Sequence, residues 1–328
     1  EILLETRFDD SKRLKELIAE ARARWESSLS EMGQQLATGR LASYLSEQGA
    51  YNDLSQLPFY RFLKELDDQF DERKTEIQES LKRVCEMIFR QPNLLINRVG
   101  GKDEIQAANQ LLPRFLEKFP KEILPKANYK FEVKPLNEGL LSGSKVQYVA
   151  QGFNFRTRGE SYRGIYKLLE TVLRYDYFWT RIRVQGGAYG SHARFERAGT
   201  MMFSSYRDPN LVETLNVYKE LPEFLRSFAP DEREMTKYVI GTISGLDTPL
   251  TPSLKGDVAV SAFFSGVTAQ DVAQERLDIL KAQPKDLQDL ADWIESGIAE
   301  NTICIFGGEE KLKKQAQLFS RLIPVTEF

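Results

Sequence analysis

The chain has 328 residues, 41% of them hydrophobic, and carries a net charge of −3. A chain of this length can bury a sizeable core and is expected to form two domains. The small negative charge provides no positive field that would attract nucleic acid or an anionic membrane, and no run of about 18 apolar residues would cross a bilayer. Composition and charge therefore disfavour a nucleic-acid-binding or membrane-bound protein.

The first 120 residues are dominated by helical periodicity. Asp9, Asp10 or Ser11 can cap the first helix, and Gly33 can interrupt it before the apolar pattern resumes. The expected elements are, in order, a helix over 12–34, a loop over 49–58, helices over 59–70 and 71–90, a strand over 94–99 and a helix up to 119. One strand cannot complete a sheet, so the missing strands are expected before residue 1, in a longer polypeptide.

Residues 120–143 are rich in proline and glycine and are expected to connect two domains. Further along, Asp208 is predicted as a helix N-cap because Pro209 suits the first helical position. The expected elements are strands over 146–155, 182–195, 200–206 and 302–306, a hairpin turn at 197–199, and helices over 161–178, 208–228, 231–244, 253–264, 269–281, 284–299 and 309–322.

The two parts share an internal similarity. The segment NLLINRVGGKDEI at 93–105 resembles NTICIFGGEEKLK at 301–313, and in both an apolar run precedes a Gly-Gly turn and a helix. The similarity predicts an α+β fold of two homologous units, over residues 1–120 and 121–328. Each would be a mostly antiparallel sheet with helices packed on one face, and the first unit would be truncated and mostly helical.

One histidine and two cysteines limit the chemistry of this chain. A catalytic zinc needs about three protein ligands, and neither H-E-x-x-H nor H-x-x-E-H occurs. His192 is therefore expected to be a surface or structural residue, and Cys85 and Cys304 to be small buried apolar residues rather than a disulfide or metal pair. A triad through His192 lacks a G-x-S-x-G elbow, and the glycines at 186–190 lack the following Lys-Ser or Lys-Thr of a nucleotide site.

Arg183 and Tyr189 are the strongest catalytic candidates. They are six residues apart in a segment expected to be extended, where an even spacing puts both side chains on one strand face unless the glycines introduce a bulge. A guanidinium and a phenol could stabilise the oxyanion of peptide hydrolysis, where each donor is worth on the order of 3 kcal/mol. From spacing alone, an ordinary surface arginine and a half-buried tyrosine remain an equally valid interpretation.

Four segments resemble zinc metallopeptidases of the insulinase (pitrilysin-like) superfamily, and most closely their presequence-protease branch. The segments are R-V-Q-G-G-A-Y-G at 183–190, S-Y-R-D-P-N at 205–210, T-I-S-G-L-D-T-P-L-T-P at 242–252, and T-R-F-D-D-S-K-R-L-K-E-L near the N-terminus. The resemblance spans essentially the whole chain and corresponds to the C-terminal half of those enzymes.

The resemblance implies catalytic roles for Arg183 and Tyr189, and substrate binding by Gly186, Gly187, Ala188 and Gly190. Residues 1–120 would be the C-terminal part of a third peptidase-like domain, and residues 121–328 the fourth domain. The zinc would be bound by the N-terminal half of the same polypeptide, which is also the implied partner, and unstructured peptides would be degraded in a closed chamber. This fragment alone is therefore expected to bind no metal and to be inactive.

Two questions stay open at the level of sequence. The superfamily also includes members without zinc, so a non-catalytic scaffold or peptide-binding protein is the alternative function. Two scattered cysteines suit a reducing compartment, either the cytoplasm or an organelle matrix.

Overall fold

The computed structural model describes residues 4–29 and 31–326 and contains two compact units, each discontinuous in sequence. The first unit comprises the described residues of Glu1–Arg22 with Leu63–Tyr129 and Thr248–Asp271. The second comprises those of Ala23–Phe62, Lys130–Asp247 and Val272–Phe328. The assignment of residues 1–120 and 121–328 to a third and a fourth peptidase-like domain stays a prediction.

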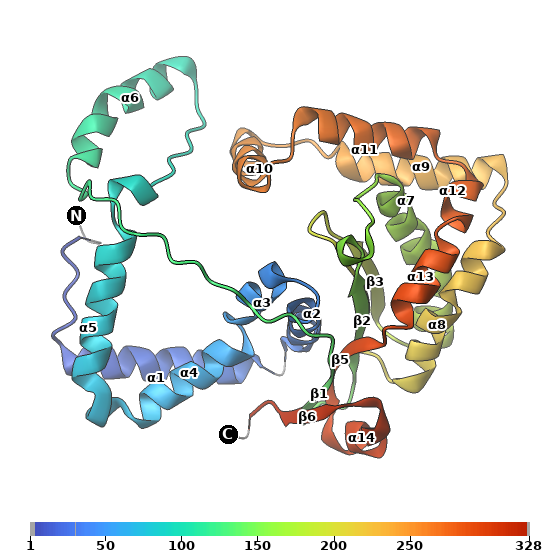
Figure 1. Cartoon of the computed structure of the whole chain (residues 1–328), viewed down its shortest axis with the longest axis horizontal. Coiled ribbons are helices and arrows are strands. Elements are labelled where there is room, and N and C mark those ends of the chain that lie inside the picture. Colours follow the sequence, from blue (N-terminus) through green and yellow to red (C-terminus); the bar gives the residue numbers. More distant parts are fainter. Residues whose placement is uncertain (1–3, 30, 327–328) are drawn as a thin grey trace. The chain divides into compact units, whose positions relative to one another are not determined.

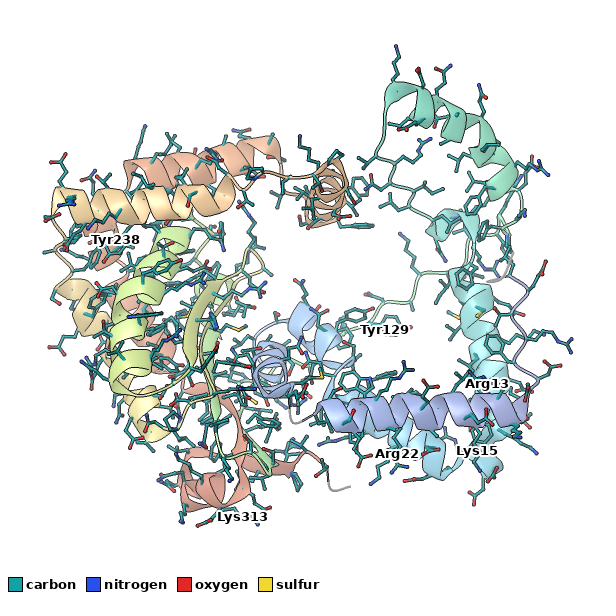
Figure 2. The ribbon with its side chains drawn as sticks, turned by 180° about the vertical axis from the view of Figure 1, so that it is seen from behind. Arg13, Lys15, Arg22, Tyr129, Tyr238 and Lys313 are labelled. Atoms are coloured by element: carbon teal, nitrogen blue, oxygen red, sulfur yellow. The ribbon has the colours of Figure 1, made fainter. Side chains whose placement is uncertain are left out.

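The first unit is helical throughout its described residues. It contains the beginning of α1 (Ser11–Ser28), the end of α4 (Leu57–Asp68), α5 (Phe70–Ile88), α6 (Lys102–Leu116) and α10 (Pro252–Ser265). Ile18, Leu66, Phe70 and Ile77 form its small core. Ion pairs add to this packing: Lys15 lies 2.6 Å from Asp71, and Arg22 lies 2.8 Å from Asp67 (Figure 2). The expected helices over 59–70, 71–90 and up to 119 are confirmed.

The strand expected over 94–99 is wrong. This segment has no strand partner among the described residues, and the exposed Val99 packs instead beside Gly256 of α10, where a Cβ would come within 2.3 Å of it. The segments at 93–105 and 301–313 therefore differ in structure, since only the second contains a strand, β5 (Thr302–Gly308). The internal similarity did not indicate a repeated fold, because an apolar run needs a neighbouring strand to become one.

Two expectations near the N-terminus also need correction. The helix expected over 12–34 ends at Ser28, and a new helix, α2 (Gly33–Ser43), starts at the glycine that was expected to interrupt it. A Cβ on Gly33 would lie 2.4 Å from the Tyr148 ring, so glycine allows α2 to approach the sheet closely. The loop expected over 49–58 overlaps α3 (Glu47–Asp53), whose N-cap Ser46 accepts a hydrogen bond of 3.0 Å from the Gly49 amide.

The second unit is built on one six-stranded sheet of order β3-β4-β2-β5-β1-β6. The strands are β1 (Asn137–Ser142), β2 (Tyr148–Asn154), β3 (Gly190–Phe195), β4 (Thr200–Tyr206), β5 (Thr302–Gly308) and β6 (Arg321–Pro324). The pairs β3–β4, β4–β2 and β2–β5 are antiparallel, whereas β1 is parallel to both β5 and β6. Helices and a mostly antiparallel sheet confirm the expected α+β class.

Two strands lie where other structure was expected. β1 lies inside the segment predicted as a connection, and β6 ends the segment predicted as a helix over 309–322, where α14 covers only Glu309–Lys314. β6 is short and at the sheet edge, where Pro324 is tolerated. The remaining helices are α7 (Ile165–Val172), α8 (Val212–Arg226), α9 (Glu232–Leu246), α11 (Ala269–Lys281), α12 (Pro284–Gln288) and α13 (Ala291–Ile298). The last two replace the single helix expected over 284–299.

Helices cover both faces of the sheet (Figure 1). The alternation along β5 shows this directly, because Ile303 and Ile305 enter the core beneath α7, α8 and α13, whereas Cys304 and Phe306 enter the core beneath α2. The expectation named helices on one face, and the structure adds α2 on the other.

A buried charged cluster lies on the α2 side of the sheet. Glu138 of β1 is 0% exposed and accepts hydrogen bonds from the Tyr44 hydroxyl and from Arg40 Nε, the latter at 2.8 Å. Arg40 also pairs with Asp53 at 2.7 Å, and burial raises the pKa of that carboxyl. Arg321 lies 3.4 Å from the second oxygen of Glu138. Arg40 thus compensates two carboxylates that water does not reach.

We expect Arg40→Met to destabilise the protein by about 3 kcal/mol, because it leaves buried carboxylates without their cation. Urea unfolding measures the loss. Arg226→Met removes exposed ion pairs with Asp292 and Glu295 and should have much less effect. Adding Glu138→Gln to Arg40→Met should recover part of the stability; equal stability of the two arginine variants would contradict the role of this cluster.

A second prediction concerns Gly297 of α13. A Cβ at this position would lie 2.3 Å from the Phe153 ring, which is fully buried in β2. Gly297→Ala should therefore destabilise the protein by about 1–3 kcal/mol through overpacking. Gly241 of α9 is the matched control, because its nearest atom would be 3.8 Å away and alanine favours a helix by about 1 kcal/mol. Thermal unfolding that ranks Gly241→Ala below Gly297→Ala would refute the prediction.

Candidate functional site

Arg183 lies in a helix rather than in the strand expected over 182–195. After α7 the chain continues as two π-helical segments, η3 (Leu173–Tyr177) and η4 (Trp179–Gln185), and β3 begins only at Gly190. The buried residues Leu173, Tyr177 and Ile182 follow at intervals of four and five, which suits the wider π-helical turn. The apolar alternation of Ile182 and Val184 suggested a strand, but Val184 is exposed.

Neighbouring helices hold the π-helical segment in place. The Tyr177 hydroxyl donates to the Val217 carbonyl of α8 at 2.7 Å, and the Tyr238 hydroxyl of α9 donates to Asp176 at 3.1 Å. Burial and the nearby Asp176 carboxylate raise the pKa of Tyr238 to about 12, so this donor stays protonated at neutral pH. Figure 2 shows Tyr238 directed from its helix toward this region.

Gly186 and Gly187 end the π-helix and reverse the chain. Gly187 has a φ of +78° and donates to the Arg183 carbonyl at 3.0 Å, while the Ala188 amide donates to the Ile182 carbonyl at 3.1 Å. A left-handed glycine with these two bonds is the usual way to close a helix C-terminus, here widened to the π-helical spacing. A Cβ on Gly186 would lie 2.6 Å from the Ile182 carbonyl, so both glycines are required structurally.

This reversal brings Arg183 and Tyr189 together. The Arg183 guanidinium carbon lies 4.4 Å from the centre of the Trp179 ring and 5.6 Å from the centre of the Tyr189 ring. Tyr189 is 65% exposed, and its amide donates to the Tyr206 carbonyl at 3.0 Å. The two side chains therefore meet across a helix end, and the expectation of a shared strand face was wrong.

Both groups are available to a ligand. Among the residues that the structure describes, Arg183 forms no ion pair, and the Tyr189 hydroxyl forms no hydrogen bond. The neighbouring Ala188 side chain is buried, so only its backbone could contact a substrate, whereas Gly190 leaves open space beside Tyr206. Substrate binding by Gly186, Gly187, Ala188 and Gly190 stays a prediction.

The segment 205–210 supports the glycine reversal. Asp208 is fully buried; one carboxylate oxygen accepts from the Asn210 amide at 2.8 Å, and the other accepts from the Thr214 hydroxyl at 2.6 Å. The Asn210 side chain then donates to the Gly186 carbonyl at 2.6 Å. Asp208 is not the N-cap expected for α8, which begins at Val212; it forms a turn before the helix. Sequence reasoning missed the role of Asn210.

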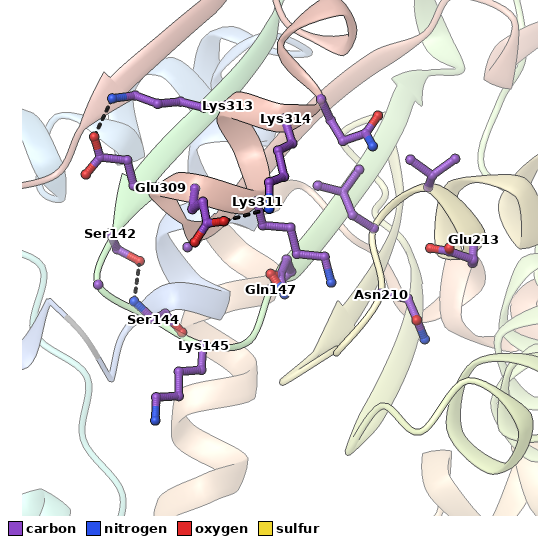
Figure 3. A pocket seen from close by; sticks show the side chains of 16 residues that line it. Ser142, Ser144, Lys145, Gln147, Asn210, Glu213, Glu309, Lys311, Lys313 and Lys314 are labelled. Atoms are coloured by element: carbon purple, nitrogen blue, oxygen red, sulfur yellow. Dashed lines mark hydrogen bonds and ion pairs between the residues drawn. The ribbon is translucent and has the colours of Figure 1, made fainter.

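A surface pocket of about 1010 Å³ lies on the other side of this segment (Figure 3). It is bordered by the turn between β1 and β2 and by the first residues of α8 and α14. Lys311 donates to the Pro209 carbonyl at its edge, while Lys313 and Lys314 pair with Glu309 and Glu310. Arg183 and Tyr189 are not among the residues that line it.

The residues of this chain do not fit a zinc site. No group of three or more His, Cys, Asp or Glu side chains that could hold a metal ion occurs among residues 4–29 and 31–326. His192 is exposed on β3, and partial burial together with the nearby Arg174 lowers its pKa. Cys85 and Cys304 are free thiols. None of the described helices is long and apolar enough to span a membrane.

Comparison with known proteins identifies relatives over the whole chain. Residues 137–308 match the family described as PreP C-terminal domain, and residues 1–66 match a segment associated with the same class of peptidases. Protein HypA of Clostridium perfringens is 39% identical over 323 residues, which are 98% of this chain and 33% of the relative. Presequence protease 1 of Arabidopsis thaliana is 28% identical, covering 90% of this chain and 28% of the relative. The chain thus spans about a third of their length.

Solved structures agree at the level of the fold. A peptidase M16 inactive domain from Pseudomonas fluorescens superposes with a TM-score of 0.53 and 15% identity, covering 92% of this chain and 70% of that one. Pitrilysin superposes with a TM-score of 0.53 and 12% identity, covering 90% and 31%. Together with the family match over residues 137–308, these similarities show that the chain belongs to the presequence-protease branch of the insulinase (pitrilysin-like) zinc metallopeptidase superfamily.

Proposed function

We propose that this chain is the C-terminal part of a zinc metalloendopeptidase that degrades unstructured peptides in a closed chamber. The observation that supports the proposal is the Arg183–Tyr189 pair, whose guanidinium and phenol lie side by side, exposed and uncommitted to other described residues. Zinc would be held by residues outside this chain, in the N-terminal half of the same polypeptide, where it would supply the metal-bound nucleophile.

The pair is suited to the negative charge that develops during peptide hydrolysis. Attack on a peptide carbonyl converts its oxygen into an oxyanion, and donors fixed in advance stabilise that charge without reorganising. Tyr189 would donate its phenolic hydrogen to this oxygen. Arg183, with its planar fork of N–H groups, would bind a neighbouring carbonyl or carboxylate of the peptide. The backbone at 186–190 would contact the peptide beside them.

The alternative is a non-catalytic scaffold or peptide-binding protein. It is supported by the similar fold of the Pseudomonas fluorescens domain, which is described as inactive. An H-x-x-E-H motif in the polypeptide that precedes this chain would favour the peptidase. We further propose a reducing compartment, because both cysteines are free and lie in different units.

The purified 328-residue chain should bind no stoichiometric zinc and hydrolyse no peptide. The reason is the absence of a metal-holding group among the described residues. Elemental analysis after dialysis gives the metal content, and a fluorogenic peptide gives the activity. One zinc per chain with chelator-sensitive cleavage would overturn this division of labour between the halves.

In the full-length enzyme, Tyr189→Phe should lower turnover about 100-fold, because it removes one oxyanion donor and keeps the ring. Steady-state kinetics on a fluorogenic peptide measures the loss. Tyr175→Phe is the matched control, since Tyr175 is 62% exposed on the same helical segment and makes no described contact with Arg183. Arg183→Lys should also reduce turnover, because an ammonium lacks the planar fork, and Arg183→Ala should additionally raise KM. Near wild-type kinetics in both Tyr189→Phe and Arg183→Ala would refute the proposal.

A further inference from the structure

Trp179 lies one turn before Arg183 on η4 and is 44% exposed. Its ring is the nearest aromatic partner of the Arg183 guanidinium, at 4.4 Å, and Tyr189 is the second, at 5.6 Å. We infer that Trp179 is a positioning residue for the site: its ring holds the Arg183 guanidinium beside the Tyr189 phenol, so that both donors address the same peptide. The inference rests on the proposed peptidase function.

An aromatic partner is suited to this task because it leaves the charge of the arginine available. Arginine has a long flexible side chain, and ordering it in advance lowers the cost of binding a substrate. A carboxylate would also order it, but would occupy its N–H groups. A tryptophan face attracts the cation through its ring quadrupole and leaves the edge of the guanidinium open.

Other arginines of the second unit show the contrast. Arg181, Arg197 and Arg158 lie over the rings of Tyr177, Tyr162 and Phe153, at 5.8, 4.5 and 5.7 Å. Each of these also pairs with a glutamate, namely Glu220, Glu275 or Glu300. Arg183 contacts two rings and no carboxylate among the described residues. Structural arginines here are neutralised, and Arg183 is ordered without being neutralised.

The helix geometry explains why the contact depends on the π-helical turn. Trp179 and Arg183 are four residues apart, close to one turn, so both side chains project from the same side of η4. The glycine reversal then returns Tyr189 to the same place, and Tyr189 packs edge-on against Tyr206 with ring centres 5.9 Å apart. Trp179, Arg183 and Tyr189 therefore form a continuous stack at the helix end.

The test uses the full-length zinc-loaded enzyme and a double-mutant cycle. Trp179→Ala should lower kcat/KM about tenfold, and Trp179→Leu should lower it similarly because leucine has bulk but no ring quadrupole. Trp179→Phe should stay within about threefold of wild type. In an Arg183→Ala background, Trp179→Ala should cause no further loss, because the tryptophan acts through the arginine.

A binding measurement complements the kinetics. Fluorescence anisotropy with a labelled peptide on the zinc-free enzyme should show the same order of affinities, and thermal unfolding should show little change in any of these variants. Tyr175→Ala, an exposed aromatic truncated four residues earlier, is the control and should leave both measurements unchanged.

Two outcomes would overturn the inference. Independent losses for Trp179→Ala and Arg183→Ala that multiply in the double variant would show that Trp179 does not act through Arg183. Equal activity of Trp179→Leu and Trp179→Phe would show that only apolar bulk matters. If Arg183→Ala alone leaves both kinetics and peptide affinity at wild-type values, the proposed function of the site fails instead.

Discussion

The position of the candidate site depends on one buried carboxylate. Asp208 is fixed because each of its oxygens accepts a hydrogen bond inside the second unit, and its backbone pairs with Gln147 in both directions at 2.8 Å. The preceding Arg207 adopts a φ of +47°, a conformation that a non-glycine residue keeps only when its surroundings enforce it. Since Asn210 reaches the Gly186 carbonyl from this loop, the same constraint sets the path from Arg183 to Tyr189.

The fold separates charge that is satisfied from charge that is available. On the α2 side of the sheet, Arg40, Glu138 and Asp53 compensate one another out of contact with water. At the end of η4, the guanidinium of Arg183 faces solvent with aromatic neighbours only, among the described residues. Buried ion pairs fix the register of the strands and helices that contribute to them, and this rigidity supports a surface site whose donors must be in place before a substrate arrives.

Sequence reasoning succeeded where periodicity and local chemistry agree, and where a motif was specific. The helices at 59–70, 71–90 and 269–281 and the hairpin at 197–199 follow from such patterns. The motif at 183–190 identified both Arg183 and Tyr189, but the predicted backbone was wrong, because Ile182 and Val184 imitate a strand while tertiary contacts of Tyr177 and Asp176 extend the helix. The run at 94–99 failed for the converse reason: its composition suits a strand, but the fold places no partner beside it among the described residues.

The position of β5 in the sheet constrains how this protein is made. β1 and β2 are complete by Asn154, yet each needs β5, which begins at Thr302, as its neighbour. On the ribosome, β1 and β2 must therefore wait, with their central edges unpaired, until the last part of this sequence has emerged. Such late closure of distant contacts slows folding and exposes strand edges to other chains. Nascent chains that stop before Thr302 should be recognised by chaperones as unfinished.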